Sequence, residues 1–227
     1  MKKILITGVT GFIGSQVAKL LSGKKYNLFA LVRPESIPKR VKEISQKFTL
    51  IDIDLANINT LKDYLSENTF DVILHIGAIR GGRKFSQEDY FKVNVHATEQ
   101  LAISALQNKS KFIFCSSVGV FGANPRELPA NEYTEKVGDN YYHYTKIEAE
   151  AIIQRYVSLG LNAVIVRPSI TYGTHDFGFP YTLTKLIHRK LLFLPDKLVQ
   201  IHLTNIDVLA DSFIKLIEFN YKPGKVY

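Results

Sequence analysis

Two groups of residues in this chain have the types and spacing needed for chemistry. Gly8, Gly11 and Gly14 are spaced by three near the N-terminus, and Tyr142 precedes Lys146 by four residues far downstream. A glycine turn lets the backbone approach a pyrophosphate, and a phenol beside an ammonium can move a proton. Together the two groups predict an enzyme that uses a nicotinamide dinucleotide.

The glycine turn lies between a predicted strand over residues 3–7 and a predicted helix over residues 12–21. In this setting Gly8 permits the tight turn, Gly11 admits the phosphate, and Gly14 lets the helix pack closely on the strand. The helix then offers free N–H groups and a partial positive charge to the phosphates. A turn without a ligand is the alternative, and the strand-turn-helix order argues against it.

Arg33 follows the second predicted strand, residues 27–32, at the position that separates NAD from NADP. A carboxylate there would accept a hydrogen bond from the ribose 2′-hydroxyl of NAD and repel the 2′-phosphate of NADP. Arg33 can instead donate two parallel bonds to a phosphate, and the nearest carboxylate, Glu35, follows a proline. We therefore predict NADP, with NAD and a solvent-facing arginine as the alternatives.

Tyr142 and Lys146 lie on a predicted helix over residues 141–159, and their spacing puts them on one face. Lowering the pKa of a phenol by about 3 units needs roughly 4 kcal/mol of preference for the phenolate. A nearby ammonium and the positive nicotinamide can supply it. Ser117 follows a predicted strand over residues 111–115 and faces the same crevice at the carboxyl ends of the sheet.

Strands and helices alternate along the chain. The expected strands cover residues 3–7, 27–32, 48–53, 71–76, 111–115 and 163–166, and the expected helices 12–21, 58–65, 87–106, 141–159, 181–189 and 205–219. This order predicts an α/β fold with a doubly wound parallel (Rossmann) sheet. We expect a dinucleotide-binding core (1–173), a small, abbreviated substrate-side lobe (174–203), and a helix with the start of a further strand returning to the core (204–227).

Composition narrows the classes of partner. The 227 residues are 46% hydrophobic and carry a net charge of +8, with one cysteine, Cys115. No apolar run approaches the roughly 18–20 residues that span a bilayer, and the N-terminal one breaks at Gly8, too early for a signal peptide. The basic residues are spread out, so we expect a surface for anionic small molecules and neither nucleic acid nor membrane as partner. A lone cysteine fits the reducing cytoplasm.

The chain resembles the extended short-chain dehydrogenases/reductases, in the NAD(P)-dependent epimerase/dehydratase group. The matching segments are residues 7–14, 54–55, 75–78, 94–95, 116–122, 142–146 and 167–173. The resemblance implies that Tyr142 is the acid/base, that Lys146 binds the nicotinamide ribose and lowers the pKa of Tyr142, and that Ser117 hydrogen-bonds the reacting oxygen. Hydride would pass between a substrate carbon and the cofactor.

The resemblance also implies the cofactor contacts. Asp54 would bind the adenine amine, and Asn94 would stabilise the sheet beside the site. The full predicted set is Gly8, Thr10, Gly11, Phe12, Ile13, Gly14, Arg33, Asp54, Leu55, Gly77, Ala78, Asn94, Tyr142, Lys146, Pro168 and Ile170. No metal is expected. Members of the family often dimerise through the helices at 87–106 and 141–159, so we expect a homodimer.

Three departures from the family pattern limit the prediction. Val118 and Gly119 replace the Asp-Glu pair of the sugar 4,6-dehydratases, so dehydration is not expected. His143 stands where the family often has glycine; we expect it to face outward, with a second proton donor as the alternative. Family members usually continue into a stretch that completes the substrate lobe, so the chain is either naturally short or incomplete.

We therefore predict an NAD(P)-dependent oxidoreductase or epimerase acting on a secondary alcohol or ketone, with a nucleotide sugar favoured. Candidate substrate contacts are the basic residues Arg80, Arg83 and Lys84 and the aromatic residues Phe177, Phe179 and Tyr181. Surface charge and core packing explain these residues equally well. A hydroxysteroid dehydrogenase-like or other carbonyl reductase is the alternative. A non-catalytic dinucleotide sensor is a third possibility, against which the retained Ser117, Tyr142 and Lys146 argue.

Overall fold

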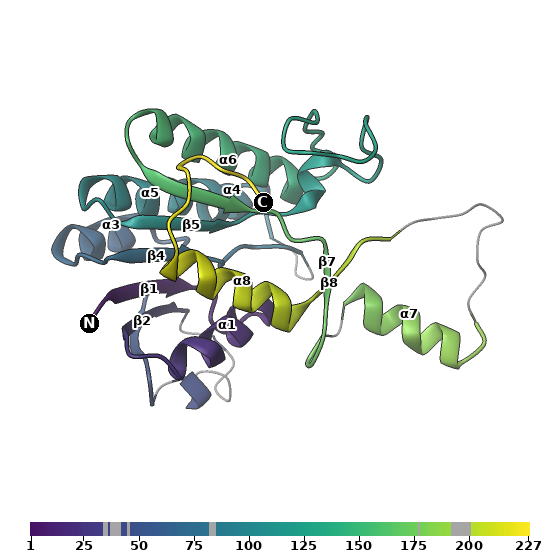
Figure 1. Cartoon of the computed structure of the whole chain (residues 1–227), viewed down its shortest axis with the longest axis horizontal. Coiled ribbons are helices and arrows are strands. Elements are labelled where there is room, and N and C mark those ends of the chain that lie inside the picture. Colours follow the sequence, from purple (N-terminus) through teal and green to yellow (C-terminus); the bar gives the residue numbers. More distant parts are fainter. Residues whose placement is uncertain (34–35, 37–41, 45, 82–84, 177, 192–200) are drawn as a thin grey trace.

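The computed structural model describes the chain except residues 34–35, 37–41, 45, 82–84, 177 and 192–200 (Figure 1). Six parallel strands form one sheet in the order β3-β2-β1-β4-β5-β6. The strands are β1 (Lys3–Thr7), β2 (Asn27–Val32), β3 (Thr49–Asp52), β4 (Val72–His75), β5 (Lys111–Cys115) and β6 (Asn162–Val166). This topology confirms the predicted doubly wound α/β fold.

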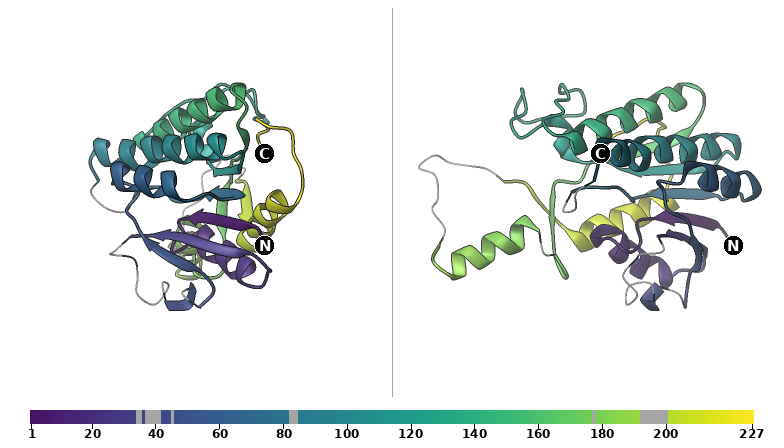
Figure 2. Two further views of the ribbon diagram at one scale, coloured as in Figure 1. Left: turned by 90° about the vertical axis from the view of Figure 1, so that its left-hand side faces the viewer. Right: turned by 180° about the vertical axis from the view of Figure 1, so that it is seen from behind.

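Helices cover both faces of the sheet (Figures 1 and 2). The α-helices are α1 (Phe12–Ser22), α3 (Ile58–Glu67), α4 (Gln87–Phe91), α5 (Ala97–Gln107), α6 (Tyr141–Ser158), α7 (Phe179–His188) and α8 (Ile206–Glu218). The hydrophobic core of one face joins the sheet to α1 and α8, and that of the other joins it to α3, α5 and α6. The sheet and the helices on its two faces therefore form a three-layer sandwich. The short α4 packs with α6, and α7 lies outside the layers.

Successive residues of a strand supply the two cores alternately. Ile4 and Ile6 belong to the core under α1 and α8, whereas Leu5 between them belongs to the opposite core. All three are fully buried. A sheet covered on both faces needs such uninterrupted apolar strands, which explains why β1 and β4 were recognisable in the sequence.

The single helix predicted over residues 87–106 is wrong at its centre. The structure has α4, then one π-helical turn at Lys92–His96, then α5. A capping box between Ser86 and Asp89 starts α4, because each satisfies a backbone N–H of the other. The wider turn accommodates an extra residue within an otherwise helical hydrophobic pattern, so periodicity alone does not reveal it.

Two short strands at either end of the predicted substrate-side segment (174–203) were not predicted. β7 (Ile170–Tyr172) pairs in parallel with β8 (Leu203–Asn205), and neither is long enough to show a period. α7 stands away from the sheet and has no buried residue (Figure 2). Phe179 and Tyr181 are each about half exposed on this helix, and Phe177 lies outside the described residues.

The C-terminal residues return to the sheet beside β6. The N–H of Ile165 donates to the carbonyl of Lys225, and the N–H of Tyr227 donates to the carbonyl of Ile165. Val226 forms a parallel bridge with Ile165. The segment after α8 thus extends the edge of the sheet that β6 would otherwise leave open.

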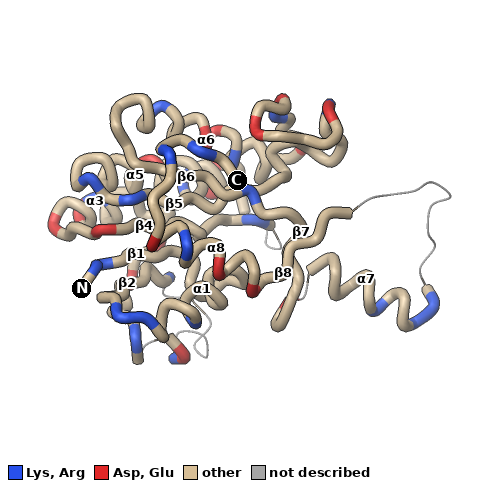
Figure 3. Tube along the Cα trace, in the orientation of Figure 1, with Lys and Arg blue, Asp and Glu red and all other residues tan. Residues whose placement is uncertain are grey.

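Charged residues are distributed over many elements rather than gathered in one stripe (Figure 3). No described helix is long and apolar enough to cross a membrane. Within the described residues no cluster of three or more His, Cys, Asp or Glu side chains has the arrangement of a metal site.

Candidate active site

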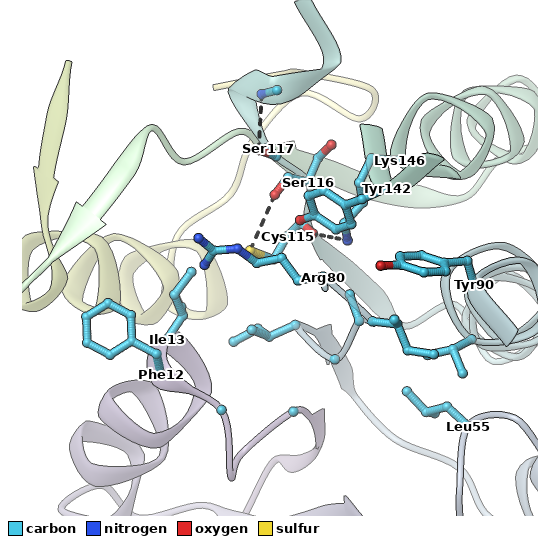
Figure 4. A pocket seen from close by; sticks show the side chains of 18 of the residues that line it. Phe12, Ile13, Leu55, Arg80, Tyr90, Cys115, Ser116, Ser117, Tyr142 and Lys146 are labelled. Atoms are coloured by element: carbon cyan, nitrogen blue, oxygen red, sulfur yellow. Dashed lines mark hydrogen bonds between the residues drawn. The ribbon is translucent and has the colours of Figure 1, made fainter. Parts of the chain in front are cut away.

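A cavity of 1250 Å³ opens at the carboxyl ends of the central strands (Figure 4). Its walls come from the glycine turn, the ends of β2, β4 and β5, the start of α6 and residues 168–171. In doubly wound sheets this is the crevice where ligands bind, because the strand order reverses there. The cavity is therefore the candidate active site.

The glycine turn makes a backbone cradle on one side of the cavity. Gly8 has φ of +78°, and a Cβ added to it would lie 2.7 Å from the nitrogen of Gly77. A Cβ on Gly14 would overlap the carbonyl oxygen of Gly8, so α1 packs on β1 without an intervening side chain. Gly11 precedes α1 with no side-chain cap on the helix N-terminus. The free N–H groups and the space above them fit a pyrophosphate.

A chain of buried hydrogen bonds supports this cradle from below. The N–H of Gly77 donates to Oγ1 of Thr7 (2.9 Å), which lies 2.7 Å from Nδ1 of His75. Nε2 of His75 lies 2.9 Å from Oγ1 of Thr98, whose hydroxyl donates to the carbonyl of Asn94. Because the Thr98 hydroxyl donates its hydrogen to the Asn94 carbonyl, its oxygen accepts from Nε2–H of His75. Nδ1 of His75 then accepts from the Thr7 hydroxyl. His75 is therefore the neutral Nε2–H tautomer.

The burial of His75 predicts acid sensitivity. Burial, followed by the charge of Lys146, lowers the pKa of His75 to about 3. In the unfolded chain the ring titrates near pH 6.5, so below that pH the unfolded state binds the proton first. We expect the free energy of unfolding to fall between pH 6.5 and pH 3, by at most about 1.4 kcal/mol per pH unit from this group.

Urea denaturation from pH 7 to pH 4 measures this effect. His75→Gln should show a shallower decline than the unaltered protein, because glutamine binds no proton in this range. His96→Gln is the matched control, since His96 is exposed. Equal slopes for the unaltered protein and His75→Gln would show that other groups cause the acid sensitivity.

Asn94 ties the loop after β4 to the helix that carries Tyr142. Its Oδ1 accepts from the N–H of Ile79, and its Nδ2 donates to the carbonyl of Ile79 and to Oγ1 of Thr145. Thr145 in turn donates to the carbonyl of Tyr142 (2.8 Å). Asn94 is buried and does not line the cavity. The π-helical turn directs Asn94 to the backbone beside the site, and its assignment to the cofactor-binding residues stays a prediction.

Gly14 also lies behind the cavity wall rather than on it. The other predicted residues all line the cavity: Gly8, Thr10, Gly11, Phe12, Ile13, Arg33, Asp54, Leu55, Gly77, Ala78, Ser117, Tyr142, Lys146, Pro168 and Ile170. Segments up to 162 residues apart in sequence, Gly8 and Ile170, thus share one cavity. The roles assigned to these residues remain predictions.

Burial dominates the electrostatics of Tyr142 and Lys146. Lys146 is 2% exposed, donates from Nζ to the carbonyl of Cys115 (2.8 Å) and stands 4.4 Å from the ring centre of Phe114. Burial lowers the pKa of Lys146 to about 8, against the attraction of its neighbours. Burial, then Cys115, raises the pKa of Tyr142, although Arg80 and the hydrogen bond to Ser117 oppose this. The phenol of this structure is therefore protonated at neutral pH.

The raised pKa of Tyr142 differs from the effect expected of Lys146. The resemblance implies that Lys146 lowers the pKa of Tyr142, whereas in the structure burial prevails and raises it. Lys146 instead directs its ammonium to the end of β5. Since the sequence pattern gives no measure of desolvation, it could not predict which effect is larger.

A second buried ionic group lies beside the cavity and was not predicted. Glu150, one helical turn after Lys146, is fully buried and accepts from Oγ of Ser116 (2.6 Å). It also accepts from Nε and Nη2 of Arg167 (2.9 and 2.7 Å) and from Nζ of Lys136 (2.9 Å). Burial alone would raise the pKa of Glu150, but Arg167, Lys136 and Ser116 together hold it below its ordinary value. The four groups join the ends of β5 and β6 to α6.

Arg80 and Ser36 also line the cavity, and neither was predicted as a cofactor contact. The Arg80 side chain points into the cavity (Figure 4), and its charge lowers the pKa values of Tyr142 and Cys115. Ser36 accepts from the backbone N–H of Arg33 (3.1 Å). The other basic candidates, Arg83 and Lys84, lie outside the described residues.

The prediction that His143 faces outward is wrong. His143 is half-buried and lines the cavity, with its ring against Gly119. The first turn of α6 packs on the 3₁₀ turn at Val118–Phe121, and this contact turns the imidazole inward. Helical spacing alone could not place it, because the opposing turn is 24 residues earlier in sequence.

Known proteins resemble this chain in sequence. The UDP-glucose 4-epimerase of Mus musculus is 28% identical over 78% of this chain and 56% of its own length. The UDP-glucose 4-epimerase of Pisum sativum is 29% identical over 78% of this chain and 54% of its own length. The chain thus spans little more than half the length of these curated relatives.

Solved structures resemble the whole described fold. The crystal structure of gox2253 is 28% identical, with a TM-score of 0.81 over 100% of this chain and 69% of that one. The Bordetella bronchiseptica enzyme WbmH, solved with NAD⁺, has a TM-score of 0.82 over 100% of this chain and 75% of that one, at 17% identity. At that identity WbmH supports the fold alone. A profile of the NAD dependent epimerase/dehydratase family matches residues 4–212, so the chain belongs to that family.

Proposed function

We propose that this protein is a dinucleotide-dependent epimerase or oxidoreductase that acts on a hydroxyl or ketone of a nucleotide sugar. The observation that carries the proposal is the cavity, in which Ser117, Tyr142 and Lys146 share a space with the glycine turn. The names of the relatives support the epimerase form. Dehydration has less support, because Val118 and Gly119 offer no carboxylate after Ser117.

The residues of the cavity suit a nicotinamide dinucleotide, which when bound supplies a hydride acceptor and donor. The N–H groups in the first turn of α1, which no side chain caps, would hold the pyrophosphate, with the Arg80 guanidinium as a further phosphate partner. Asp54 would hold the adenine amine, and Leu55, Gly77 and Ala78 would line its binding half. The nicotinamide would lie against Pro168 and Ile170.

Proton transfer would fall to Tyr142. Its phenol would give a proton to, or take one from, the substrate oxygen, which Ser117 would hold by a hydrogen bond. Lys146 would bind the ribose hydroxyls, and its pKa of about 8 leaves it largely charged at neutral pH. Burial keeps the phenol protonated. For it to serve as the base, the positive charges near it, including Arg80, would have to lower its pKa.

We further propose NADP as the cofactor, with NAD as the alternative. Arg33 lies at the cavity wall beyond β2, where a guanidinium would pair with a 2′-phosphate. The hydroxyl of Ser36, which lies beside Arg33, would be a second partner for that phosphate. The crystal structure of UDP-glucuronic acid 4-epimerase from Bacillus cereus in complex with NAD, 25% identical to this chain, supports the alternative.

Replacing Arg33 tests this choice. Arg33→Ala is expected to raise the Kd for NADPH by about tenfold to a hundredfold, the value of a charge-assisted bond, and to leave that for NADH unchanged. Tryptophan is absent, so titrations would follow the fluorescence of the reduced nicotinamide. Arg126→Ala is the control, because Arg126 is an exposed arginine that pairs with Glu135. Tighter binding of NADH than NADPH by the unaltered protein would contradict the proposal.

The form of catalysis can be tested by denaturing the purified protein and identifying any released dinucleotide by chromatography. Retained NAD would favour an epimerase that recycles its cofactor in place, and would overturn the interpretation of Arg33. A protein that binds added NADPH reversibly would favour a dehydrogenase or carbonyl reductase, including the hydroxysteroid-like alternative. Binding without turnover of any alcohol or ketone would favour the sensor.

We also propose a homodimer in the cytoplasm. The helices α4, α5 and α6 lie together on one side of the sheet and would form the proposed interface (Figure 1). The single unpaired Cys115 suits a reducing compartment. Sedimentation equilibrium should give about twice the monomer mass of 25.7 kDa. Tyr144→Glu, on the exposed side of α6, should shift the protein to monomer, and a monomer before substitution would remove the proposal.

A further inference from the structure

The imidazole of His143 is held in a fixed position at the cavity wall. The carboxylate of Asp139 lies 2.5 Å from Nδ1 of the ring, and its other oxygen accepts from the N–H of Ala123 (2.7 Å). Asn140 caps α6 by accepting from the N–H of His143. The carboxylate that orients the ring is thus itself anchored to backbone.

These contacts determine the tautomer. A carboxylate can only accept, so Nδ1 of His143 must carry the hydrogen that faces Asp139. This bond is the largest cause that lowers the pKa of Asp139. Nδ2 of Asn140 lies 3.1 Å from the same carboxylate oxygen and donates to it. In the neutral ring, Nε2 is left as a hydrogen-bond acceptor.

Gly119 lies against the imidazole of His143. A Cβ on Gly119 would overlap the ring, with Nε2 of His143 the nearest ring atom, followed by Cδ2 and Cε1. Gly119 thus makes room for the imidazole because it has no side chain.

Nε2 is also accessible. Both polar contacts of the His143 ring with described residues are at Nδ1. Nδ1 donates to Asp139, whereas Nδ2 of Asn140, itself a donor, lies 2.8 Å from Nδ1 and directs its hydrogen to Asp139. No buried polar side-chain atom of the described residues lacks a partner, so Nε2 is not a buried atom. His143 lines the same cavity as Tyr142, and the two ring centres are 5.6 Å apart. The cavity therefore presents a phenol and an oriented acceptor on one wall.

We propose that His143 contacts the substrate directly, with Nε2 accepting a hydrogen bond from a second hydroxyl of the molecule on which Tyr142 acts. This inference rests on the proposed function and narrows its substrate class. A polyhydroxylated ring such as the pyranose of a nucleotide sugar offers that second hydroxyl. A ketone with no further hydroxyl beside the reacting carbon does not. His143 is thus a specificity-determining residue for sugars.

The rival explanation is that His143 only fills the space above Gly119. His143→Phe separates the two, because phenylalanine keeps a ring over Gly119 but has no acceptor. Asp139→Asn provides a second variant. Its carbonyl oxygen would accept from Ala123, so its amide would donate to Nδ1 of His143 and shift the ring proton to Nε2. The acceptor in the cavity would then be a donor.

Calorimetric titration of the dinucleotide-saturated protein with UDP-glucose and with UDP tests the proposal, in a Tyr142→Phe background that prevents turnover. We expect His143→Phe to raise the Kd for UDP-glucose by about three- to tenfold, which corresponds to one neutral hydrogen bond, and to leave the Kd for UDP unchanged. Two-dimensional ¹H–¹⁵N NMR of the imidazole should show Nδ1–H before substitution and Nε2–H in Asp139→Asn. His96→Phe is the control, since His96 is exposed.

The outcomes separate the two proposals. Equal affinity for UDP-glucose before and after His143→Phe overturns the role of His143 and leaves the proposed function standing. Equal weakening of UDP and UDP-glucose shows a packing role and overturns it as well. Failure of the protein with His143 intact to bind either UDP or UDP-glucose overturns the nucleotide-sugar function, and the inference with it.

Discussion

Tyr142→Phe should lower kcat by about 10²- to 10⁴-fold and leave the Kd for the dinucleotide within about twofold. The substitution removes one hydroxyl, the group proposed to exchange a proton with the substrate, and keeps the ring. Burial raises the pKa of the phenol, so it carries a proton at neutral pH, and phenylalanine has no proton to exchange at that position. Turnover with UDP-glucose and titration with reduced dinucleotide measure the two quantities.

Tyr133→Phe is the control, since Tyr133 is 90% exposed and lies outside the cavity and the proposed dimer interface. Its kcat should stay within about twofold, as for a surface substitution. Turnover at the original rate in Tyr142→Phe would exclude the proposed mechanism. A simultaneous loss of dinucleotide binding would mean that the hydroxyl supports the structure of the site rather than the reaction.

Glu150→Gln should destabilise the protein by about 3–5 kcal/mol, because it leaves buried cations without their anion. Arg167 cannot turn to water, since its side chain is only 5% exposed. Lys136 can, since its side chain is 29% exposed. For a domain of this size about 1 kcal/mol corresponds to 2–4 °C, so Tm should fall by roughly 6–20 °C. Thermal unfolding followed by circular dichroism measures the change.

The pH dependence of this effect has a definite sign. The folded pKa of Glu150 is lowered, so its contribution is present above the unfolded pKa of about 4.3 and is lost as the pH falls through the folded value. The difference in stability between the protein with Glu150 and Glu150→Gln should therefore be largest near neutral pH.

Two further variants identify the cause of the effect. Glu148→Gln, two residues earlier on α6 and only partly buried, should change stability by less than about 0.5 kcal/mol. Combining Glu150→Leu with Arg167→Met removes both charges, and should recover part of the loss because no unpaired ion remains. A Glu150→Gln variant as stable as the original would show that water or another group compensates Arg167.

The sequence determined those features that depend on neighbouring residues. An apolar run, three glycines at a spacing of three and a helical pattern together specify strand, turn and helix, and the structure has β1 and α1 at those places. Tyr142 and Lys146 share the cavity wall because four residues make about one helical turn. The alternation of such units was enough to predict the parallel sheet.

Tertiary structure alone decided the contacts between distant segments. Glu150 meets Arg167, and His143 covers Gly119, only because α6 packs against the ends of β5 and β6. The π-helical turn aims Asn94 at the backbone of Ile79 instead of the cavity. Burial raises the pKa of Tyr142 where spacing suggested a decrease. Desolvation and long-range packing depend on the assembled sheet, and a one-dimensional pattern of residues contains neither.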